Sequence, residues 1–346
     1  MKATSFRPGE LWPDTAGAHV NAHGGGILYH DGAYYWFGEH KIAGDAGNRA
    51  HVGVGVYRSA DLYNWENLGV ALAVHDDPAS DITRECVLER PKVIYNPRTK
   101  QFVMWFHLEL KGQGYKAART GLAVSDSVAG PYTFVRSLRP NAGQWPLNMP
   151  RPAETPAFNE EDPDRWFHRD FPGGQMARDM SLFVDDDGSA YHLHASEENA
   201  TLHISKLTDD YLDFTGEYVR LFRGRFHEAP AMFKRGGKYY LFSSDCTGWA
   251  PNPARLSTAD QVLGEWTELG NPCVGEPEKI ATTFESQSTH VLKVEGQDAY
   301  IFMADRWRPK DAIDGRYIWL PIEFDPTGKP ELRWRDEWTL DHFATA

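Results

Sequence analysis

Residues 226–242 read FHEAPAMFKRGGKYYLF. The stretch has a polar start, an apolar run from Ala229 to Phe233, a turn at residues 236–237 and a second run rich in aromatic residues. This succession of apolar runs and turn residues is typical of a β-hairpin. Glu228 stands just before the first predicted strand, so its carboxylate is expected at the mouth of that strand.

Four other segments share this pattern. Each has a polar leading residue, an apolar strand, a turn and a partner strand; the segments are residues 21–37, 89–106, 178–193 and 286–303. A weaker pattern follows most of these hairpins and predicts a third strand, a turn and an outer strand. Repeats of about 40–50 residues with four strands each are the signature of a β-propeller. The sequence therefore predicts an all-β, five-bladed β-propeller, formed as a single domain over residues 1–346.

The longest insertion between the repeats runs from about residue 140 to 176 and is rich in Pro, Asn and acidic residues. A long irregular segment within a compact domain is usually functional or mobile. We expect this segment to form a loop over the mouth of the central cavity.

Composition excludes several classes of partner. The chain has 346 residues, of which 13% are aromatic, and a net charge of −13. It has no basic stripe to neutralise phosphates, so nucleic acid is not an expected partner. No apolar run is long enough to cross a bilayer, and residues 1–8 lack the apolar core of a signal peptide. We expect no membrane partner and a cytoplasmic location, or a secreted or periplasmic one if a signal has been removed.

The leading residues of five radially arranged hairpins would converge on the central axis. These residues are His23, Glu89, Asp179, Glu228 and Gln287. Three of them are carboxylates, and two carboxyl groups flanking a glycosidic bond are the minimum requirement for glycoside hydrolysis. One carboxyl group must stay protonated near neutral pH to act as an acid, and a neighbouring carboxylate and partial desolvation both raise its pKa.

The repeats also resemble a known family. Residues 178–188 (RDMSLFVDDDG) and 227–240 (HEAPAMFKRGGKYY) resemble the third- and fourth-blade motifs of glycoside hydrolase family 43. A narrower resemblance is to the branch that holds exo-β-1,3-galactanases and related galactofuranosidase- or arabinofuranosidase-like enzymes. It rests on residues 21–26 (NAHGGG), 89–93 (ERPKV), 247–249 (TGW) and 286–288 (SQS). The resemblance covers essentially all of residues 17–343.

The resemblance implies a five-bladed propeller that hydrolyses its substrate with inversion. It assigns Glu228 as the general acid and Asp179 as the carboxylate that tunes the pKa of the acid and orients it. Most of the family has an aspartate as general base in the first blade, and this chain lacks it. In the galactanase-like branch a glutamine of the fifth blade holds the attacking water, and Gln287 matches that place. A neutral amide is a poor base, so either its imidic tautomer acts or Glu89 or Glu39 assists.

Other residues are candidates for binding the sugar. Trp249, just after the fourth-blade hairpin, is placed to stack on a sugar face. Further candidates for walls of the site are Trp145, Trp166 and Trp307. The residues expected to hydrogen-bond sugar hydroxyls are His23, Glu39, Glu197 and Arg306, with a surface role as the open alternative for the last three.

One histidine is a candidate metal ligand. His290 lies deeper along the fifth-blade strand than Gln287 and could point down the axis. Central histidines in the family can coordinate calcium through waters, so the resemblance allows a structural Ca²⁺ at His290, with a core histidine as the alternative. No cofactor is expected to be required.

The predicted function is an inverting exo-glycosidase that removes a terminal galactosyl unit, as a β-galactoside or a β-D-galactofuranoside, from an oligosaccharide or polysaccharide. The exo mode is inferred from the long loops, which would block one end of the cavity. Two alternatives stay open: an α-L-arabinofuranosidase, because the two furanoses have similar ring geometry, and a non-catalytic sugar-binding propeller, because the first-blade aspartate is missing.

Overall fold

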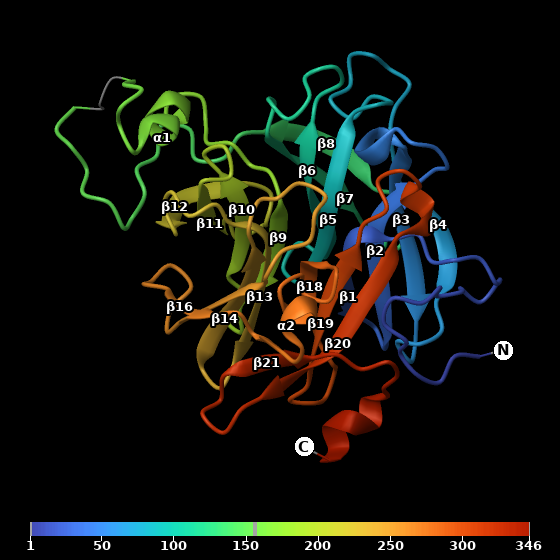
Figure 1. The fold of residues 1–346 in the computed structure, drawn as a ribbon. Helices are drawn as coiled ribbons and strands as arrows, with labels where there is room; N and C mark the ends of the chain where they lie inside the picture. Colours follow the sequence, from blue (N-terminus) through green and yellow to red (C-terminus); the bar gives the residue numbers. More distant parts are fainter. Residues whose placement is uncertain (1, 155–157, 346) are drawn as a thin grey trace.

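Five β-sheets surround a common axis in the computed structural model, which describes residues 2–154 and 158–345 (Figure 1). The first blade consists of β1 (His23–His30), β2 (Ala33–Lys41), β3 (His51–Ser59) and β4 (Glu66–Ala73). The second consists of β5 (Val87–Asn96), β6 (Gln101–Glu109), β7 (Arg119–Ser125) and β8 (Thr133–Leu138). The third consists of β9 (Met180–Val184), β10 (Ala190–Ser196), β11 (Thr201–Leu207) and β12 (Phe214–Leu221).

The fourth blade consists of β13 (Glu228–Arg235), β14 (Lys238–Ser244), β15 (Arg255–Ala259) and β16 (Thr267–Gly270). The fifth consists of β18 (Gln287–Lys293), β19 (Tyr300–Arg306), β20 (Arg316–Phe324) and β21 (Pro330–Arg333), with β17 (Cys273–Val274) added in parallel to β21. The described helical segments are short: α1 (Arg165–Asp170), α2 (Pro277–Ile280), and the 3₁₀ turns η1 (Gly47–Arg49), η2 (Ala312–Asp314) and η3 (Leu340–Thr345). These elements confirm the predicted five-bladed β-propeller.

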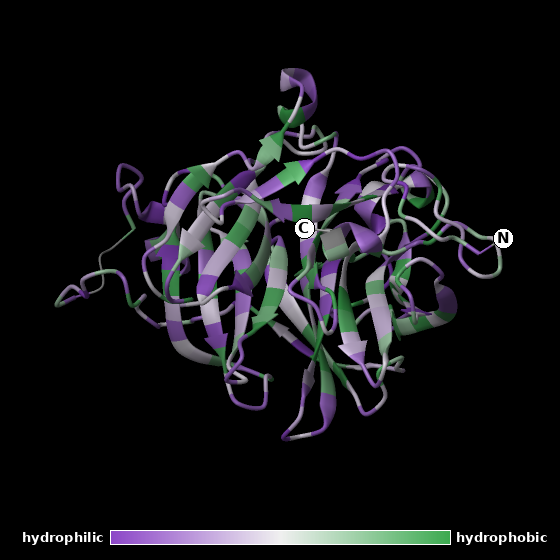
Figure 2. Cartoon of the chain, turned by 90° about the horizontal axis from the view of Figure 1, so that it is seen from below, coloured by the Kyte–Doolittle hydropathy of each residue, from purple (hydrophilic) through white to green (hydrophobic). Residues whose placement is uncertain are grey.

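The inner strands form a closed ring. Each of β1, β5, β9, β13 and β18 contacts the next, and β18 contacts β1. Figure 2 shows apolar and polar residues interspersed along the strands, and the inner strands are buried over most of their length, as expected for strands that are covered on both faces. Each blade therefore packs one face on the blade before it and the other on the blade after it.

A separate apolar cluster fills each gap between blades. The first and second blades share one around Phe37 and Phe106, and the third and fourth share one around Leu193 and Leu241. The other gaps are filled in the same way. Burying one large apolar side chain contributes roughly 1.5–3 kcal/mol, so these five clusters hold the ring together.

The gap between the fifth and first blades is closed by aromatic residues near the two ends of the chain. Phe6 and Trp338 exchange two backbone hydrogen bonds of 2.8 and 3.1 Å, and their rings stack with centroids 4.3 Å apart. The buried indoles of Trp36 and Trp319 pack between them and the inner strands. The first residues thus join the last blade to the first.

The insertion at residues 140–176 does not cover the central cavity, and that expectation is wrong. The backbone N–H of Leu147 donates to the carbonyl of Tyr218 (2.8 Å), and Asn148 makes two hydrogen bonds with the backbone of Arg220. These contacts lay the insertion along β12, the outer strand of the third blade, with α1 at the periphery (Figure 1). Residues 155–157 of the insertion lie outside the described residues. Among the described residues, no helix is long and apolar enough to cross a membrane.

Candidate active site

A β-bulge lies beside the leading residue of four inner strands. The register shifts fall between His23 and Gly26, Glu89 and Lys92, Glu228 and Ala231, and Ser288 and His290. In three of these strands the next residue has a left-handed backbone: Gly24 (φ 59°), Arg90 (φ 53°) and Ala229 (φ 55°). A bulge bends its strand and re-aims a side chain. In the second and fourth blades the bulge lies directly beside Glu89 and Glu228 and re-aims their side chains.

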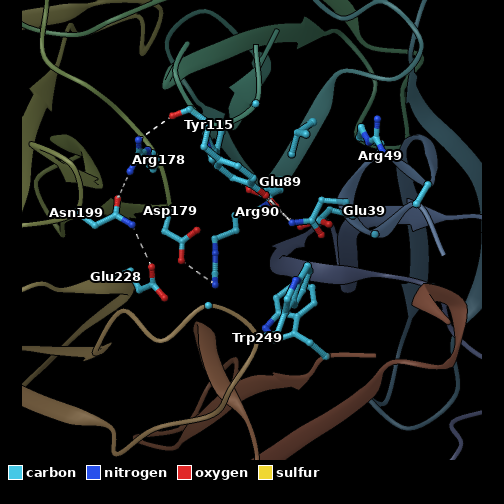
Figure 3. Close-up of a pocket in the computed structure, with 18 of the residues that line it drawn as sticks. Glu39, Arg49, Glu89, Arg90, Tyr115, Arg178, Asp179, Asn199, Glu228 and Trp249 are labelled. Atoms are coloured by element: carbon cyan, nitrogen blue, oxygen red, sulfur yellow. Dashed lines mark hydrogen bonds and ion pairs between the residues drawn. The ribbon is translucent and has the colours of Figure 1, made fainter. Parts of the chain in front are cut away.

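Four of the five leading residues meet in one cavity. Glu89, Asp179, Glu228 and Gln287 line a cavity of about 680 Å³ at one end of the axis (Figure 3). Loops from different blades form the rest of its wall, with residues 46–49, Tyr115, Trp249 and Trp307 among them. Acids that are far apart in the sequence thus face a shared cavity.

The carboxyl group of Glu228 is held by two amides. Nε2 of Gln287 donates to Oε1 (3.0 Å), and Nδ2 of Asn199 lies 3.3 Å from Oε2. Burial and the negative charge of Asp179 raise the pKa of Glu228 to about 7, against the opposing charge of Arg90. A carboxyl group with this pKa carries its proton near neutral pH and can donate it.

Asp179 lies directly before β9 and contacts two other blades. Its Oδ2 is 2.9 Å from Nη2 of Arg90, at the second-blade bulge, and accepts a hydrogen bond from the backbone N–H of Ala229 (3.1 Å). Ala229 follows Glu228 in the chain, so this contact fixes the backbone that carries the acid. Asp179 therefore acts on Glu228 in two ways: its charge raises the pKa of the acid, and its hydrogen bond to Ala229 fixes the backbone next to the acid.

Gln287 begins β18 and is fixed at both ends of its amide. Nε2 donates to Glu228 and to Oγ of Ser244 (2.9 Å), while Oε1 accepts from Nη2 of Arg90. The carbonyl oxygen retains a second lone pair. A water could donate a hydrogen bond to it.

Glu89 is held ionised. Its Oε2 is 2.8 Å from Nδ1 of His107, and its Oε1 accepts from the hydroxyl of Tyr115 (2.8 Å) and from Asn48. Burial acts to raise the pKa of Glu89, but the hydrogen bond and charge of His107 prevail and lower it to about 2. Glu109 binds the other ring nitrogen, and together the two carboxylates outweigh burial and raise the pKa of His107 to about 10. Glu89 is thus a permanent negative charge and a weak base.

The axis is closed beneath the cavity. Nζ of Lys92 donates to the carbonyls of Gly24 (2.7 Å) and Arg90 (3.3 Å), and a Cβ added to Gly26 would lie 2.5 Å from Cδ of Lys92. A second cavity of about 270 Å³ opens at the other end of the axis, beside Lys92 and His290. Within the described residues, the two cavities share no lining side chain. The catalytic cavity is therefore blind: it has a mouth but no passage along the axis to the other end of the ring.

Three of the predicted sugar-binding residues reach the cavity, and one of these is fully buried. Trp249 lines the cavity with 46% of its surface exposed, a position suited to the predicted stacking on a sugar. Trp307, also at the cavity wall, lies edge-on to the indole of Trp249, with the ring centroids 6.0 Å apart. Glu39 is also at the wall but is fully buried, where it pairs with Lys41 (2.6 Å) and accepts from the backbone N–H of Arg90. Glu39 is therefore committed to internal contacts and is not available to a sugar hydroxyl.

The structure does not place three of the predicted sugar contacts at the wall of this cavity. His23 is buried behind Trp307 and stacks on it at 5.2 Å. Glu197 is 2% exposed in the turn between β10 and β11 of the third blade, where its carboxylate binds other side chains. Arg306 lines a neighbouring depression and donates to the carbonyl of Phe284 (2.9 Å). None of the three lines the cavity described above.

Trp145 is not a subsite wall either. Its indole packs on Phe167 and Phe171 within the insertion, at centroid distances of 5.1 and 5.5 Å. Trp166 lies in α1 of the same insertion and stacks under the guanidinium of Arg165. The two tryptophans stabilise the insertion.

The surroundings of His290 do not fit a cation. The ring lies beside Lys92, and burial together with the charge of Lys92 lowers the pKa of His290 to about 3. Within the described ranges, the one group of acids, His or Cys close enough to hold a metal is Glu89, His107 and Asp179. Those three are already bound to one another or to Arg90, as described above. The structure therefore does not support the predicted metal role of His290.

Sequence reasoning missed several residues of the site. Arg90 and Arg178 directly follow or precede predicted acids, so their position in the repeat was an available signal. Asn48, Tyr115 and Asn199 come from turns and loops between strands, where no repeat pattern marks them. The strand pattern could locate the acids but not the side chains that hold them.

Known proteins match the chain over most of its length. The model of glycosyl hydrolases family 43 matches residues 162–330. A solved β-1,3-galactosidase of glycoside hydrolase family 43, in complex with galactodeoxynojirimycin, is 52% identical and has a TM-score of 0.93 over 97% of this chain and 100% of that chain. An exo-β-1,3-galactanase from Phanerochaete chrysosporium, solved with β-1,3-galactotriose, is 32% identical with a TM-score of 0.80, over 98% of this chain and 68% of that chain.

A shorter match links the chain to a curated relative. A β-D-galactofuranosidase from Aspergillus niger is 29% identical over 145 residues, which is 41% of this chain and 41% of that protein. The matched segment therefore spans less than half of that relative.

Proposed function

The chain belongs to glycosyl hydrolases family 43, and from that premise we propose that it removes one terminal β-linked galactosyl unit from a glycan, with inversion at the anomeric carbon. Its relatives include a β-1,3-galactosidase at 52% identity and an exo-β-1,3-galactanase at 32% identity. A β-1,3-linked galactan or galacto-oligosaccharide is accordingly the proposed substrate.

The single observation that carries the proposal is the state of Glu228 in the blind cavity. Its pKa of about 7 leaves it protonated near neutral pH, whereas Glu89, whose pKa the contact with His107 lowers to about 2, has no proton to donate. In the proposed reaction Glu228 protonates the glycosidic oxygen while the bond from that oxygen to the anomeric carbon breaks. Asp179 keeps the acid protonated through like-charge repulsion until that moment.

Gln287 is the proposed site of the attacking water. The water donates one hydrogen bond to Oε1 of Gln287 and attacks the anomeric carbon from the face opposite the leaving oxygen. Its proton passes to Oε1 as the amide becomes its imidic tautomer, and the proton on Nε2 passes to Glu228, which has just lost its own. The 3.0 Å contact between Nε2 and Oε1 of Glu228 supplies this path. Glu89, with its pKa near 2, is too weak a base for that role.

The blind cavity supports attack at a chain end. Lys92 and the backbone around it close the axis beneath the site, so a glycan can enter only from the mouth. A sugar unit at the bottom of such a cavity must be a terminal one, because nothing can extend beyond it.

A second candidate substrate is a terminal β-D-galactofuranoside. It is favoured by the 29% identical galactofuranosidase. The furanose ring presents its hydroxyl groups at different positions to the same acid. A direct comparison of turnover on the two kinds of galactoside therefore distinguishes the two substrates.

The test is a screen of β-D-galactopyranosides, β-D-galactofuranosides and α-L-arabinofuranosides, together with β-1,3-galactobiose. We expect turnover of the galactopyranosides and the disaccharide, with the α anomer of galactose seen first by NMR. Release of the β anomer would contradict inversion, and turnover confined to a furanoside would replace the proposed sugar. Binding of galactobiose with no product on prolonged incubation would instead identify a sugar-binding propeller.

A further inference from the structure

The turn between β10 and β11 has an unusual backbone. Glu197, Glu198 and Asn199 have φ of 55°, 56° and 66°, so three consecutive residues other than glycine are left-handed. Each such residue is energetically unfavourable and persists only where the surroundings determine it. The contacts of the three side chains show what holds the turn.

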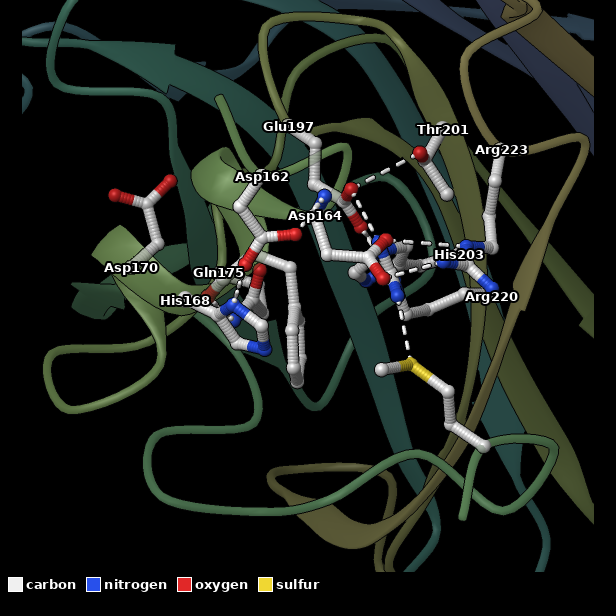
Figure 4. Close-up of polar contacts among 12 residues, drawn as sticks. Asp162, Asp164, His168, Asp170, Gln175, Glu197, Thr201, His203, Arg220 and Arg223 are labelled. Carbon is white, nitrogen blue, oxygen red and sulfur yellow. Dashed lines mark hydrogen bonds and ion pairs between the residues drawn. The ribbon is translucent and has the colours of Figure 1, made fainter. Parts of the chain in front are cut away.

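The first residue anchors the turn to the insertion. The carboxylate of Glu197 accepts from Nε2 of His203 (2.8 Å) and Nε of Arg220 (2.7 Å). Nη2 of Arg220 lies 2.8 Å from Oδ1 of Asp164, which directly precedes α1 (Figure 4). Glu197 and Arg220 are 2% exposed, so this network is a buried link between the turn and the insertion.

The second residue makes another link to the insertion. The carboxylate of Glu198 lies 3.0 Å from Nη1 of Arg169, in α1, and 2.8 Å from Nη2 of Arg178. Arg178 directly precedes Asp179, and its Nη2 also donates to the carbonyl of Tyr115 (2.7 Å). Glu198 therefore holds Arg178 from the side opposite the cavity.

The third residue contacts the acid. Oδ1 of Asn199 accepts from Nη1 of Arg178 (3.4 Å), which directs Nδ2 of the same amide toward Oε2 of Glu228 (3.3 Å) (Figure 3). An amide whose oxygen is bound by a guanidinium cannot flip without losing both contacts. The order of contacts thus runs from α1 through Glu198 and Arg178 to Asn199 and the acid.

We propose that Glu198, Arg178 and Asn199 are positioning residues through which the insertion at residues 140–176 sets the orientation of the Glu228 carboxyl group toward the leaving oxygen. This deepens the proposed function and rests on it. No described residue of the insertion lines the cavity, yet the insertion acts on proton transfer because it fixes the turn. The three residues act through Glu228 and are not themselves donors of the transferred proton.

The test compares two leaving groups. Release of galactose from β-1,3-galactobiose needs proton donation to the leaving sugar, whereas 2,4-dinitrophenolate leaves without a proton. A misplaced acid therefore lowers turnover of the disaccharide and spares 2,4-dinitrophenyl β-galactoside, whereas a general structural defect lowers both. This ratio separates positioning from folding.

Two variants and one control carry the measurement. Glu198→Gln removes the charge that binds Arg169 and Arg178 and keeps the size of the side chain. Asn199→Gly removes the side-chain amide at a position whose left-handed φ glycine adopts easily. The control is Arg98→Gln, which breaks an exposed ion pair of 3.0 Å between Arg98 and Asp209, away from the cavity. Thermal unfolding of each variant accompanies the kinetics.

We expect both variants to lose about tenfold or more in kcat/KM on the disaccharide, within the range of general acid catalysis. Turnover of the dinitrophenyl substrate should stay within about twofold, and Arg98→Gln should change neither. Equal losses on both substrates, or no loss with Asn199→Gly, would overturn the inference. If Glu198→Gln does not fold, Asn199→Gly decides alone. Wild-type protein that hydrolyses neither galactoside would overturn the proposed function, and this inference with it.

Discussion

The guanidinium of Arg90 lies 2.9 Å from the carboxylate of Asp179 and joins the leading residues of the second and third blades. Arg90 also donates to Gln287 of the fifth blade, and Asp179 accepts from the backbone of the fourth. One ion pair thus touches four of the five blades at the point where they meet. Both the catalytic geometry and the stability of the ring depend on it.

Replacing Arg90 should destabilise the protein strongly. The side chain of Arg90 is 5% exposed, so Arg90→Met would leave the Asp179 carboxylate buried without its partner. Breaking a buried pair in this way costs about 3–5 kcal/mol. Chemical denaturation measures the loss. Arg98→Met, at an exposed pair, should cost less than about 1 kcal/mol, and an equal loss in both variants would contradict the central role of Arg90.

Removing the acid should stop turnover and spare the fold. Glu228→Gln retains the shape of the side chain but has no proton to donate. Loss of a general acid typically lowers the rate by about 10²–10⁴-fold. We expect a loss of this size on β-1,3-galactobiose, measured by release of galactose, with a cooperative thermal transition retained. Residual activity above a few per cent of wild type would exclude Glu228 as the acid.

The raised pKa of Glu228 couples activity and stability to pH. Because Glu228 must be protonated to act, kcat/KM should fall as the pH rises through about 7. The folded pKa lies above the ordinary value of 4.5, so this group's stabilisation is present below pH 4.5 and is lost as the pH rises through about 7. The loss amounts to about 3 kcal/mol at most.

Glu228→Gln isolates that effect. At pH 8 the variant should be more stable than wild type, and at pH 4 the two should be alike, as measured by urea denaturation. Asp305, whose pKa burial also raises to about 7, titrates in both proteins and cancels in the comparison. A stability difference that does not change between the two pH values would show that Glu228 is ionised in the folded protein.

Placing a charge at Gln287 should move the pH profile. Gln287→Glu puts a carboxylate beside Glu228, 3.0 Å away in the present geometry. A like charge at this distance raises the pKa of the acid, so the alkaline limb of kcat/KM should move up by about one pH unit or more. Ser244→Ala removes a contact of Gln287 without adding charge and should leave the limb in place. A limb that is unmoved by Gln287→Glu would place the titrating group elsewhere.

Trp249 should contribute to binding rather than to chemistry. Its indole is 46% exposed at the cavity wall, and covering part of that apolar surface with a sugar face contributes roughly 25 cal/mol per Å² buried. Trp249→Ala should raise KM about three- to tenfold and leave kcat and stability close to wild type. Phe158→Ala, at an exposed aromatic residue in the insertion, is the matched control and should change none of these values.

The repeat pattern was sufficient to predict the architecture because the same physical demand recurs in every blade. Each inner hairpin must bury both faces between neighbouring sheets, which leaves an apolar run bounded by turns, as at residues 226–242. The position of Glu228 at the start of its strand followed directly from that pattern. The bulge at Ala229 did not, because an alanine with a φ of 55° leaves no mark on the sequence.

The rest of the site could not be predicted from strand periodicity. Glu197 and Asn199 are two residues apart in one turn, yet Asn199 lines the cavity while Glu197 is buried against His203 and Arg220, which lie in other strands. The insertion was misplaced for a related reason. Its length and lack of regular structure suggested a loop over the cavity mouth, whereas Phe167 and Phe171 pack against Tyr218 of the third blade.

Lys92 closes the axis below Arg90, so a sugar released in the cavity can leave only by the mouth through which the glycan entered. The shortened glycan must withdraw before the released monosaccharide can escape, and the next terminus to arrive can belong to any molecule in solution. For the proposed reaction this geometry predicts distributive hydrolysis, in which every chain of a galactan pool shortens in step and no single chain is consumed to its end in one encounter.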